Sequence, residues 1–226
     1  QRRYEEVRAG FGDRMPWQPI RITGDLLADW EFEAAEGNHF TDSSPNDCRL
    51  KCEGVSLDAG RGGKVLRCGN GGAVTSVPGA FFHPGGVTVS LWCKPSEKGQ
   101  SDRWMLNTVS GETDGYRLGL HGGRPVWQVP REPWSHSLAG PEPLPLSEWS
   151  HLTATFDGRV MRLYVNGKEV AEMERLGFIK PGNSITIGGY SADLDRARFR
   201  GWLDSVRIYR RVLSSGEIED LAKMAP

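Results

Sequence analysis

Apolar and polar positions alternate along several short segments of the chain, which is the pattern of β-strands with one buried face. Val87, Val89 and Leu91 share one face of the clearest segment, and Pro95 ends it. Similar runs occur at residues 116–121, 151–156, 160–165, 168–171, 185–187 and 202–209. The pattern predicts many short strands from about residue 25 onward.

Glycine-containing dipeptides connect three of these runs. Asp157-Gly158 follows the run 151–156, and Asn166-Gly167 precedes the run 168–171. Both dipeptides are strong hairpin signals, because the two central residues of a type I′ turn need positive φ. We therefore predict an antiparallel meander over residues 150–172.

A short helix is predicted near the end of the chain, over residues 214–222. Ser214 and Glu217 have the spacing of a capping box, and Ile218 and Leu221 follow on one face. Many short antiparallel strands with one terminal helix predict an all-β fold. We expect a two-sheet antiparallel β-sandwich, or jelly roll, with a short C-terminal helix.

The chain has 226 residues, the length of one all-β domain or two small ones. Residues 1–23 lack the alternation and are interpreted as a linker or the tail of a preceding domain, with residues 24–226 as the jelly-roll domain. The 28 basic and 29 acidic residues give a net charge of −1, so we expect no nucleic-acid partner. No apolar run approaches the roughly 18–20 residues of a membrane helix, and we expect no membrane insertion.

Four cysteines are too few and too irregularly spaced for a disulfide framework. Cys68 and Cys93 lie in apolar runs, where a free cysteine acts as a small hydrophobic residue. Cys48 and Cys52 form a CxxxC in a polar segment, which is either a local disulfide or a pair of free thiols.

Four stretches together resemble laminin-G-like domains of the concanavalin A-like lectin/glucanase superfamily. The stretches are, in chain order, TDSS at residues 41–44, VTVSLWCKP at 87–95, WSHLTATFDG with LYVNG at 149–158 and 163–167, and GWLDSVRIY with LSSGEI at 201–209 and 213–218. The resemblance spans about residues 25–223. It implies a jelly roll and a secreted, periplasmic or cell-surface protein.

The resemblance also implies a structural calcium ion bound by Asp204, with Asp42 as a second carboxylate ligand. Asp204 has the same parity as Val206 and Ile208 in its strand, and a carboxylate on an apolar face needs a partner. Calcium prefers six to eight oxygen ligands, and Asn46, Asp47 or backbone carbonyls could complete the shell. Alternatively, Asp204 accepts N–H groups of a buried loop.

Glu31, Glu33 and Glu36 resemble the carboxylate strand of glycosidases of this fold. Such enzymes need two carboxyl groups at a fixed separation across the sugar. Here the middle acid is glutamate instead of aspartate, and the stretch lies on the first strand instead of a central one. We therefore expect these residues to be replaceable by glutamine, and the chain not to be an enzyme.

A proline-rich segment, residues 128–147, has no clear alternation and is predicted to be a long loop. Trp134 in this loop could stack on a sugar ring, with Arg131 and His136 as polar neighbours; it could also simply anchor the loop. We predict an adjoining wall made by Trp127 and His121, on the side facing away from the apolar residues of their strands. Weaker candidates for the same rim are Trp104 and Tyr190.

Arg196, Arg198 and Arg200 share one face if their segment is extended, and they could bind an anionic polysaccharide or simply form a solvated surface. The sequence as a whole favours a non-catalytic binding module of a larger exported protein that recognises glycan. The alternative is a protein-interaction or structural accessory domain that contacts a neighbouring domain. A glycoside hydrolase of the same fold is the third choice.

Overall fold

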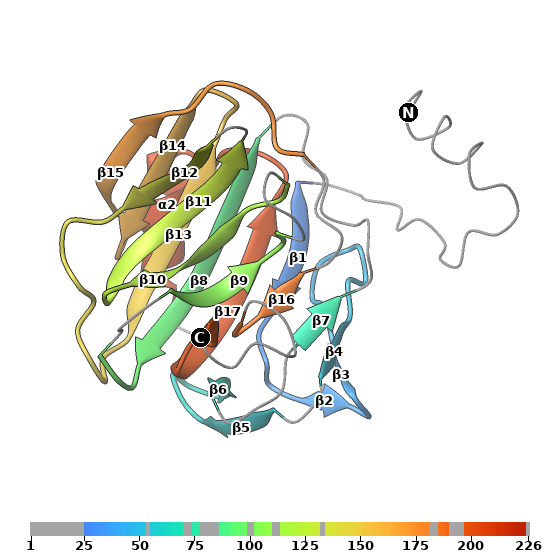
Figure 1. The fold of residues 1–226 in the computed structure, drawn as a ribbon. Helices are drawn as coiled ribbons and strands as arrows, with labels where there is room; N and C mark the ends of the chain where they lie inside the picture. The colour runs from blue at the N-terminus through green and yellow to red at the C-terminus, as the bar shows by residue number, and fades with distance from the viewer. Residues whose placement is uncertain are drawn as a thin grey trace, which may run out of the picture.

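The computed structural model describes residues 25–52, 55–69, 74–76, 86–98, 102–109, 114–131, 134–180, 185–189 and 197–224. Its strands form two antiparallel sheets packed face to face, which confirms the predicted sandwich (Figure 1). The expected linker over residues 1–23 lies outside the described residues. No helix in the described ranges has the length and apolar character needed to span a membrane.

Sheet A has eight strands and lies behind sheet B in the view of Figure 1. Its order is β15 (Lys168–Glu174), β14 (Val160–Val165), β13 (Ser150–Phe156), β8 (Val87–Pro95), β17 (Gly201–Tyr209), β6 (Lys64–Cys68) and β5 (Ser56–Ala59), and β1 (Leu26–Trp30) also pairs with β17.

Sheet B has nine strands. Its order is β12 (Trp134–Ala139), β11 (Arg124–Arg131), β10 (Arg117–His121), β9 (Arg103–Asn107), β16 (Thr186–Ile187), β7 (Val74–Ser76), β4 (Leu50–Cys52), β3 (His39–Phe40) and β2 (Ala35–Glu36).

The predicted meander is present as β13, β14 and β15. Asn166 and Gly167 have φ of +50° and +80°, as a type I′ turn requires. The turn at Asp157 is longer, because Phe156 pairs with Met161, and only Gly158 of the dipeptide has positive φ. The Asp157 carboxylate shapes this turn by accepting the N–H groups of Arg159 and Val160, each at 2.7 Å.

The core lies between the two sheets and is built from the apolar faces that the alternation indicated. Val89 and Leu91 of β8 and Leu152 of β13 are fully buried, and Leu118 and Trp127 face them from sheet B. The side chains on the other face of sheet A point away from this core, and they form the surfaces considered below.

A β-bulge in β17 reverses which residues face the core. Ser205 has φ of +47°, and the register shifts between Asp204 and Arg207. Before the bulge, Leu203 is buried in the core; after it, Val206 and Ile208 are. The prediction that Asp204 shares a face with Val206 and Ile208 was therefore wrong, because the extra residue of a bulge breaks the two-residue period.

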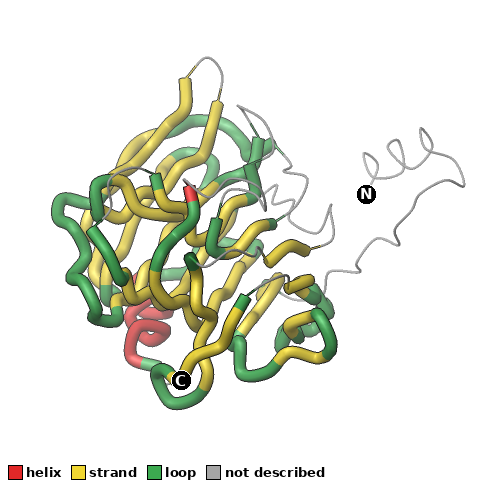
Figure 2. Tube along the Cα trace, turned by 60° about the horizontal axis from the view of Figure 1, so that its bottom comes forward, coloured by secondary structure: helices red, strands yellow, loops and turns green. Residues whose placement is uncertain are grey.

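Helix α2 (Ser215–Lys223) lies outside the sandwich, against the outer face of sheet A (Figure 2). Ser214 caps it, and the capping box with Glu217 is present as predicted. Ile218 and Leu221 pack with Leu213 and with Tyr164 of β14 in a second, smaller apolar cluster. The helix thus covers one part of the outer face and leaves another uncovered.

Strands β11 and β12 pair as a hairpin, so the prediction of a long irregular loop over residues 128–147 was wrong up to Ala139, whereas residues 140–147 form no strand. Strands β11 and β12 pair from Val126 opposite Ala139 to Arg131 opposite Trp134. Pro130 lies within β11, and its carbonyl accepts a hydrogen bond from Arg175 at 2.8 Å. The prolines hid the alternation in the sequence without preventing strand pairing.

Candidate functional site

A row of aromatic and basic side chains crosses the outer face of sheet A at the end that α2 does not cover. In β17, Trp202 pairs with Lys94 of β8 on one side and with Arg67 of β6 on the other. Residues directly opposite each other in an antiparallel pair point to the same face, so these three side chains lie side by side. Trp149 directly precedes Ser150, which pairs with Cys93, and so extends the row beyond Lys94.

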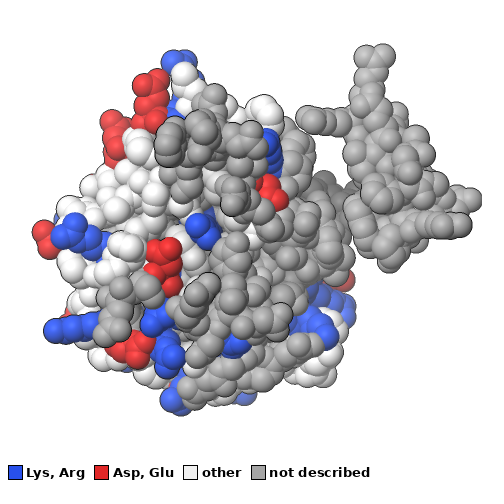
Figure 3. Space-filling view, viewed as in Figure 1, with Lys and Arg blue, Asp and Glu red and all other residues white. Residues whose placement is uncertain are grey.

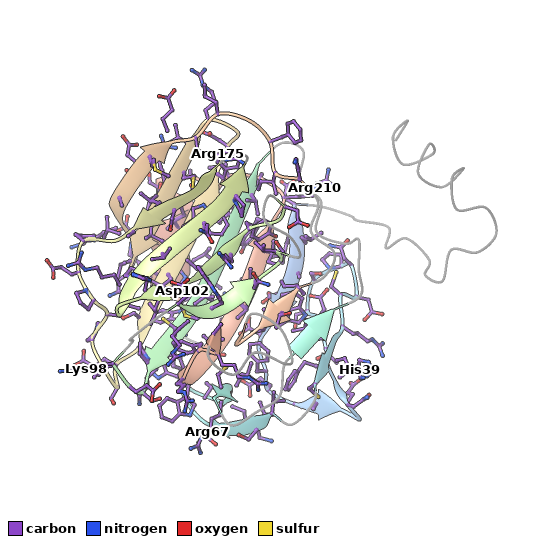
Figure 4. All side chains as sticks on the ribbon, viewed as in Figure 1. His39, Arg67, Lys98, Asp102, Arg175 and Arg210 are labelled. Carbon is purple, nitrogen blue, oxygen red and sulfur yellow. The ribbon has the colours of Figure 1, made fainter. Side chains whose placement is uncertain are left out.

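This row borders a groove of about 320 Å³, here called the Trp149–Trp202 groove. Its lining consists of Asp58, Ala59, Gly60, Arg61, Val65, Lys94, Trp149 and Trp202. Both tryptophans are half-buried, so each indole presents part of its surface to solvent. Arg67, at the end of the row, is labelled at the lower end of the molecule in Figure 4.

Polar contacts fix the orientation of Trp202. Its indole Nε1 donates a hydrogen bond to Asp58 Oδ2 at 2.8 Å, and the same carboxylate oxygen is 3.5 Å from the Arg67 guanidinium. The Lys94 ammonium lies 5.3 Å from the centre of the Trp202 ring, within range of a cation–π interaction. The ring is therefore held in place before any ligand arrives.

Arg61 forms a rigid wall of the groove. Its guanidinium carbon lies 3.5 Å from the centre of the Trp92 ring, and its Nη1 is 3.7 Å from Asp204 Oδ2. The same guanidinium donates to the carbonyl of Met224 at the end of α2, at 3.1 Å. Only 10% of the side chain is exposed, so Arg61 is a fixed structural cation rather than a mobile surface charge.

Asp204 is buried beneath Arg61, as expected for a carboxylate with a specific partner. Its Oδ1 accepts the backbone N–H of Ser205 at 2.8 Å, while Oδ2 faces Arg61. Burial, reinforced by the negative charge of Glu31, raises the pKa of Asp204 to about 6. These contacts match the alternative reading of Asp204 as a carboxylate that holds a buried backbone turn.

Asp42 is also held by hydrogen-bond donors. Its Oδ1 accepts the N–H groups of Asp29 and Ser44 at 2.8 and 2.9 Å, and its Oδ2 accepts the Ser44 hydroxyl and the Cys48 N–H at 2.6 and 2.7 Å. Four donors occupy the lone pairs with which a carboxylate would bind a metal. As arranged, Asp42 and Asp204 do not fit a shared calcium shell.

Within the described ranges, no three His, Cys, Asp or Glu side chains are grouped as metal ligands would be. Calcium binding stays a prediction of the family resemblance. It is tested by melting curves with calcium and with a chelator: a higher melting temperature in calcium that Asp204→Ala removes supports it, and identical curves contradict it.

Two of the three glutamates compared with glycosidase carboxylates, Glu31 and Glu33, have hydrogen-bond partners, and Glu36 is exposed. Glu31 accepts a hydrogen bond from the Ser205 hydroxyl at 2.8 Å and pairs with Arg207, whose Nε is 3.1 Å from Asp29 Oδ1. Burial raises the pKa of Asp29 to about 7, against the opposing effect of Arg207. Glu33 accepts the N–H of Lys64 at 3.1 Å. This cluster joins β1 to β17 and does not line the groove.

A serine–histidine pair also lies on the outer face of sheet A, under the region between Arg61 and α2. Ser90 Oγ and His151 Nε2 are 2.8 Å apart, but both residues are fully buried. Burial, together with the positive charges of Arg61 and Arg207, lowers the pKa of His151 to about 3. The pair packs against Trp92, with His151 and Trp92 ring centres 5.1 Å apart, and serves packing rather than nucleophilic chemistry.

Trp127 is not available to a ligand, so this part of the predicted binding wall was wrong. It pairs with Leu118 and therefore points into the core, where it is fully buried 5.5 Å from Tyr116. His121 has the opposite parity and lies on the other face. Its side chain is 70% exposed, and its Nδ1 is 2.7 Å from Asp102 Oδ1. The structure separates the two residues that the sequence placed on one wall.

The other candidates for this rim are only partly described. The backbones of Arg131, Trp134 and His136 lie in the β11–β12 hairpin, and their side chains lie outside the described residues, so their role stays a prediction. Tyr190 is also outside the described residues. Trp104 is only 3% exposed beneath the Arg117 guanidinium, so its prediction as a rim residue was wrong.

The arginine segment does not form one exposed edge. Arg196 lies outside the described residues, Arg198 is buried, and Arg200 is half-buried with its Nε 3.2 Å from Glu97. On the face seen in Figure 3, basic and acidic side chains are interspersed along the rim.

The four cysteines are free thiols, which resolves the open question at Cys48 and Cys52. Burial raises the pKa of Cys48 to about 12, so its thiol is not a nucleophile at neutral pH.

Sequence reasoning missed Trp149 and Trp202 as surface residues. Neither residue was among the site residues predicted from the sequence. The available signal was the pair of opposed dipeptides Trp92–Cys93 and Trp202–Leu203, in which each tryptophan neighbours a core residue. Adjacent strand residues point to opposite faces, so Trp92 and Trp202 must both face outward, away from the core side of Cys93 and Leu203.

Comparison with known proteins supports the fold. The family model described as the concanavalin A-like lectin/glucanases superfamily matches residues 69–219. No match to the chain was found among curated proteins.

Solved structures of similar shape include binding domains of toxins and a domain of an arabinanase. The binding domain of Paraclostridial Mosquitocidal Protein 1 has a TM-score of 0.69 and 20% identity, covering 88% of this chain and 52% of that one. Domain 4 of AbnA, an extracellular GH43 arabinanase from Geobacillus stearothermophilus solved in complex with arabinotriose, has a TM-score of 0.69 and 21% identity, covering 88% and 98%. The binding domain of botulinum neurotoxin DC in complex with SialylT has a TM-score of 0.67 and 15% identity, covering 88% and 51%.

This chain therefore spans about half the length of the toxin domains and nearly all of the arabinanase domain. At these identities the likeness concerns the fold. Because the family model covers more than half of the chain and both sheets are present, the chain belongs to the concanavalin A-like lectin/glucanase superfamily.

Proposed function

We propose that this chain is a non-catalytic module that binds glycan in the Trp149–Trp202 groove. The observation that carries the proposal is the pair of half-buried tryptophans that flank one groove, together with Lys94 and Asp58. An indole face packs against the C–H groups of a sugar ring, and a few fixed polar groups supply orientation. Trp202 is already oriented by Asp58, which lowers the entropy lost on binding.

The similar structures support a binding role. Several are binding domains of toxins, and the arabinanase domain was solved in complex with arabinotriose. Glu31 is engaged by Ser205 and Arg207 of β17 and Glu33 by the backbone of Lys64, which supports a non-catalytic role. Following the family resemblance, we place the module in a larger exported protein.

A glycan array tests the proposal, with wild type, Trp149→Ala and Trp202→Ala compared on the same surface. Phe178→Ala is the matched control, because this aromatic is 64% exposed and lies in the loop after β15, outside the groove. Binding that is lost in the two tryptophan variants and kept in the control supports the proposal. An array on which wild type binds nothing, or on which all variants bind equally, contradicts it.

A protein partner is the second candidate, and a specific observation favours it. Leu176 and Phe178 are 51% and 64% exposed on one loop, a pair of large apolar side chains held in water. The loop is rigid: the buried Arg175 guanidinium donates to the carbonyls of Phe178 and Pro130 at 3.2 and 2.8 Å. Figure 4 labels Arg175 at the end of the molecule opposite Arg67, so this surface is separate from the groove.

A further inference from the structure

A second, smaller pocket lies beside the Trp149–Trp202 groove and shares Trp202 with it. This pocket has a volume of about 140 Å³ and is lined by Arg67, Cys68, Gly69, Ser96, Glu97, Arg200, Gly201 and Trp202. Trp202 lines both pockets, so the two lie next to each other across β8, β17 and β6, and together they are here called the path. The path is longer than a single sugar residue requires.

Positive charge exceeds negative charge along this path. Its lining contains four basic residues, Arg61, Lys94, Arg67 and Arg200, and two acidic residues, Asp58 and Glu97. Arg61 is paired with the buried Asp204, Arg67 with Asp58, and Arg200 with Glu97. Lys94 has no carboxylate partner among the described residues, and its contact there is the face of Trp202.

Lys94 is placed between the two tryptophans. The strand order is β13, β8, β17, so Trp149 and Trp202 are two strands apart, which is roughly 10 Å, with Lys94 on the strand between them. Each sugar ring advances a glycan by about one strand spacing, so the first and third of three consecutive rings would stack on the two indoles and the middle ring would lie over the Lys94 ammonium. A negatively charged group at that position would form an ion pair with the Lys94 ammonium, which has no carboxylate partner among the described residues.

We propose that the groove selects an acidic oligosaccharide, in which a carboxylate or sulfate group on the middle of three rings pairs with Lys94 while the two outer rings stack on Trp149 and Trp202. This inference rests on the proposed glycan-binding function and adds the chemical class of the ligand. A carboxylate or sulfate at Lys94 makes a charge-assisted hydrogen bond in a partly enclosed site. A neutral glycan keeps the stacking and loses this contact.

Nucleic acid is the other anionic polymer with flat rings that stack on aromatic side chains. The structure favours sugar, because the groove offers a single unpaired ammonium rather than a basic track that follows a phosphate backbone. An oligothymidylate is therefore included among the probes.

The experiment measures binding of the folded chain by calorimetry to oligogalacturonate, to a sulfated dextran oligosaccharide, to their neutral counterparts (methyl-esterified oligogalacturonate and dextran oligosaccharide) and to oligothymidylate. We expect an acidic glycan to bind at least roughly tenfold more tightly than its neutral counterpart at 50 mM salt, and the difference to shrink at 500 mM salt. Comparing the carboxylate with the sulfate probe identifies the acid group.

Three variants assign the effect to Lys94. Lys94→Gln should lose most of the preference for the acidic glycan, Lys94→Arg should retain it, and Lys168→Gln, the same charge change at an exposed position of β15, should leave it unchanged. Melting curves of each variant show whether it is folded. Retention of affinity in Lys94→Arg separates loss of charge from loss of structure.

The outcomes separate this inference from the proposed function. Equal binding of acidic and neutral glycans, with Lys94→Gln silent and Trp202→Ala defective, overturns the acidic preference and leaves the glycan site standing. Oligothymidylate binding as tightly as the acidic glycan overturns the choice of ligand class. No binding of any glycan by wild type, here and on the array, overturns both.

Discussion

The outer face of sheet A has two ends that differ in what covers them. At one end, α2 packs over the sheet, and the outward side chain of Tyr164 joins Leu213, Ile218 and Leu221 in an apolar cluster. At the other end, the outward side chains are Trp149, Lys94 and Trp202, which line an open groove, and Arg67, which lines the neighbouring pocket. The two ends share strands β8 and β17.

Between the two ends lies a buried polar boundary. Arg61, Asp204, His151 and Ser90 are placed where the α2 cluster ends and the groove begins. Arg61 joins the two regions, because it stacks on Trp92, pairs with Asp204 and donates to the carbonyl that ends α2. The comparison indicates that the covered end contributes stability and the open end contributes binding. Arg61 connects the two ends through its contacts with Met224, Trp92 and Asp204.

The covered end can be weakened without touching the groove. Ile218 is fully buried between α2 and the sheet, so Ile218→Ala should cost about 2–5 kcal/mol of unfolding free energy through lost apolar contact and a cavity. Urea unfolding measures this cost. Glycan affinity of the folded fraction should not change; a large loss of affinity in a fully folded variant would show that the two ends are coupled.

The boundary should be sensitive to pH once Arg61 is removed. Arg61→Ala leaves Asp204 buried without its guanidinium partner, and we expect a cost of about 3 kcal/mol at pH 8. The pKa of Asp204 is already raised to about 6, so the carboxyl takes up a proton below that pH and the cost should shrink at pH 5. A penalty that is the same at both pH values would mean that Asp204 is not the group left unpaired.

The cluster of Asp29, Glu31 and Arg207 makes the free energy of unfolding depend on pH in a direction that follows from the raised pKa of Asp29. The folded state holds a proton on Asp29 up to about pH 7, while the unfolded chain loses it near 3.8, so stability falls as pH rises through that window. His151, with its pKa lowered to about 3, contributes the opposite slope below about 6.5. Wild type and an Asp29→Asn variant both contain His151, so the difference between their stability–pH profiles isolates the contribution of Asp29.

From pH 5 to pH 8, wild type should lose more stability than Asp29→Asn, by on the order of 2 kcal/mol, in urea titrations at both pH values. Arg207 and Glu31 are the charged neighbours that set this behaviour, and both remain in the variant. Parallel pH profiles for the two proteins would contradict the raised pKa.

The open end should tolerate substitution best. Trp202 is half-buried and lies outside the core, so Trp202→Ala should cost only about 1 kcal/mol of stability, far less than truncation of a core tryptophan. Thermal or urea unfolding gives the value. A cost comparable to that of Ile218→Ala would place Trp202 in the structural framework and weaken the division between the two ends.

Most of the fold was readable from the sequence, because alternation and turn dipeptides are local signals. The strands around Val89 and Leu152, the turn at Asn166 and Gly167, and the Ser214 capping box all depend on residues a few positions apart. The β11–β12 hairpin was missed because prolines interrupt the pattern that reveals a strand.

The candidate site was harder to predict, because it depends on which face is covered. The bulge at Ser205 changes the facing of β17, and nothing local in the sequence marks it. Trp127 was assigned to a surface, and the structure buries it in the core, whereas Trp149, which was not predicted as a site residue, lies half-buried in the groove. Burial is decided by the partner sheet and by α2, which a strand pattern does not contain.

The most direct test of the account is to locate the surface that a bound glycan protects. Hydrogen exchange would be measured with and without the ligand found on the array, following the backbone amides of residues 57–67 and of the β11–β12 hairpin. The account predicts slower exchange in residues 57–67, which supply Asp58, Arg61 and Arg67, and no change in residues 124–139. Protection confined to the hairpin would contradict it and move the binding site to the surface around Trp134.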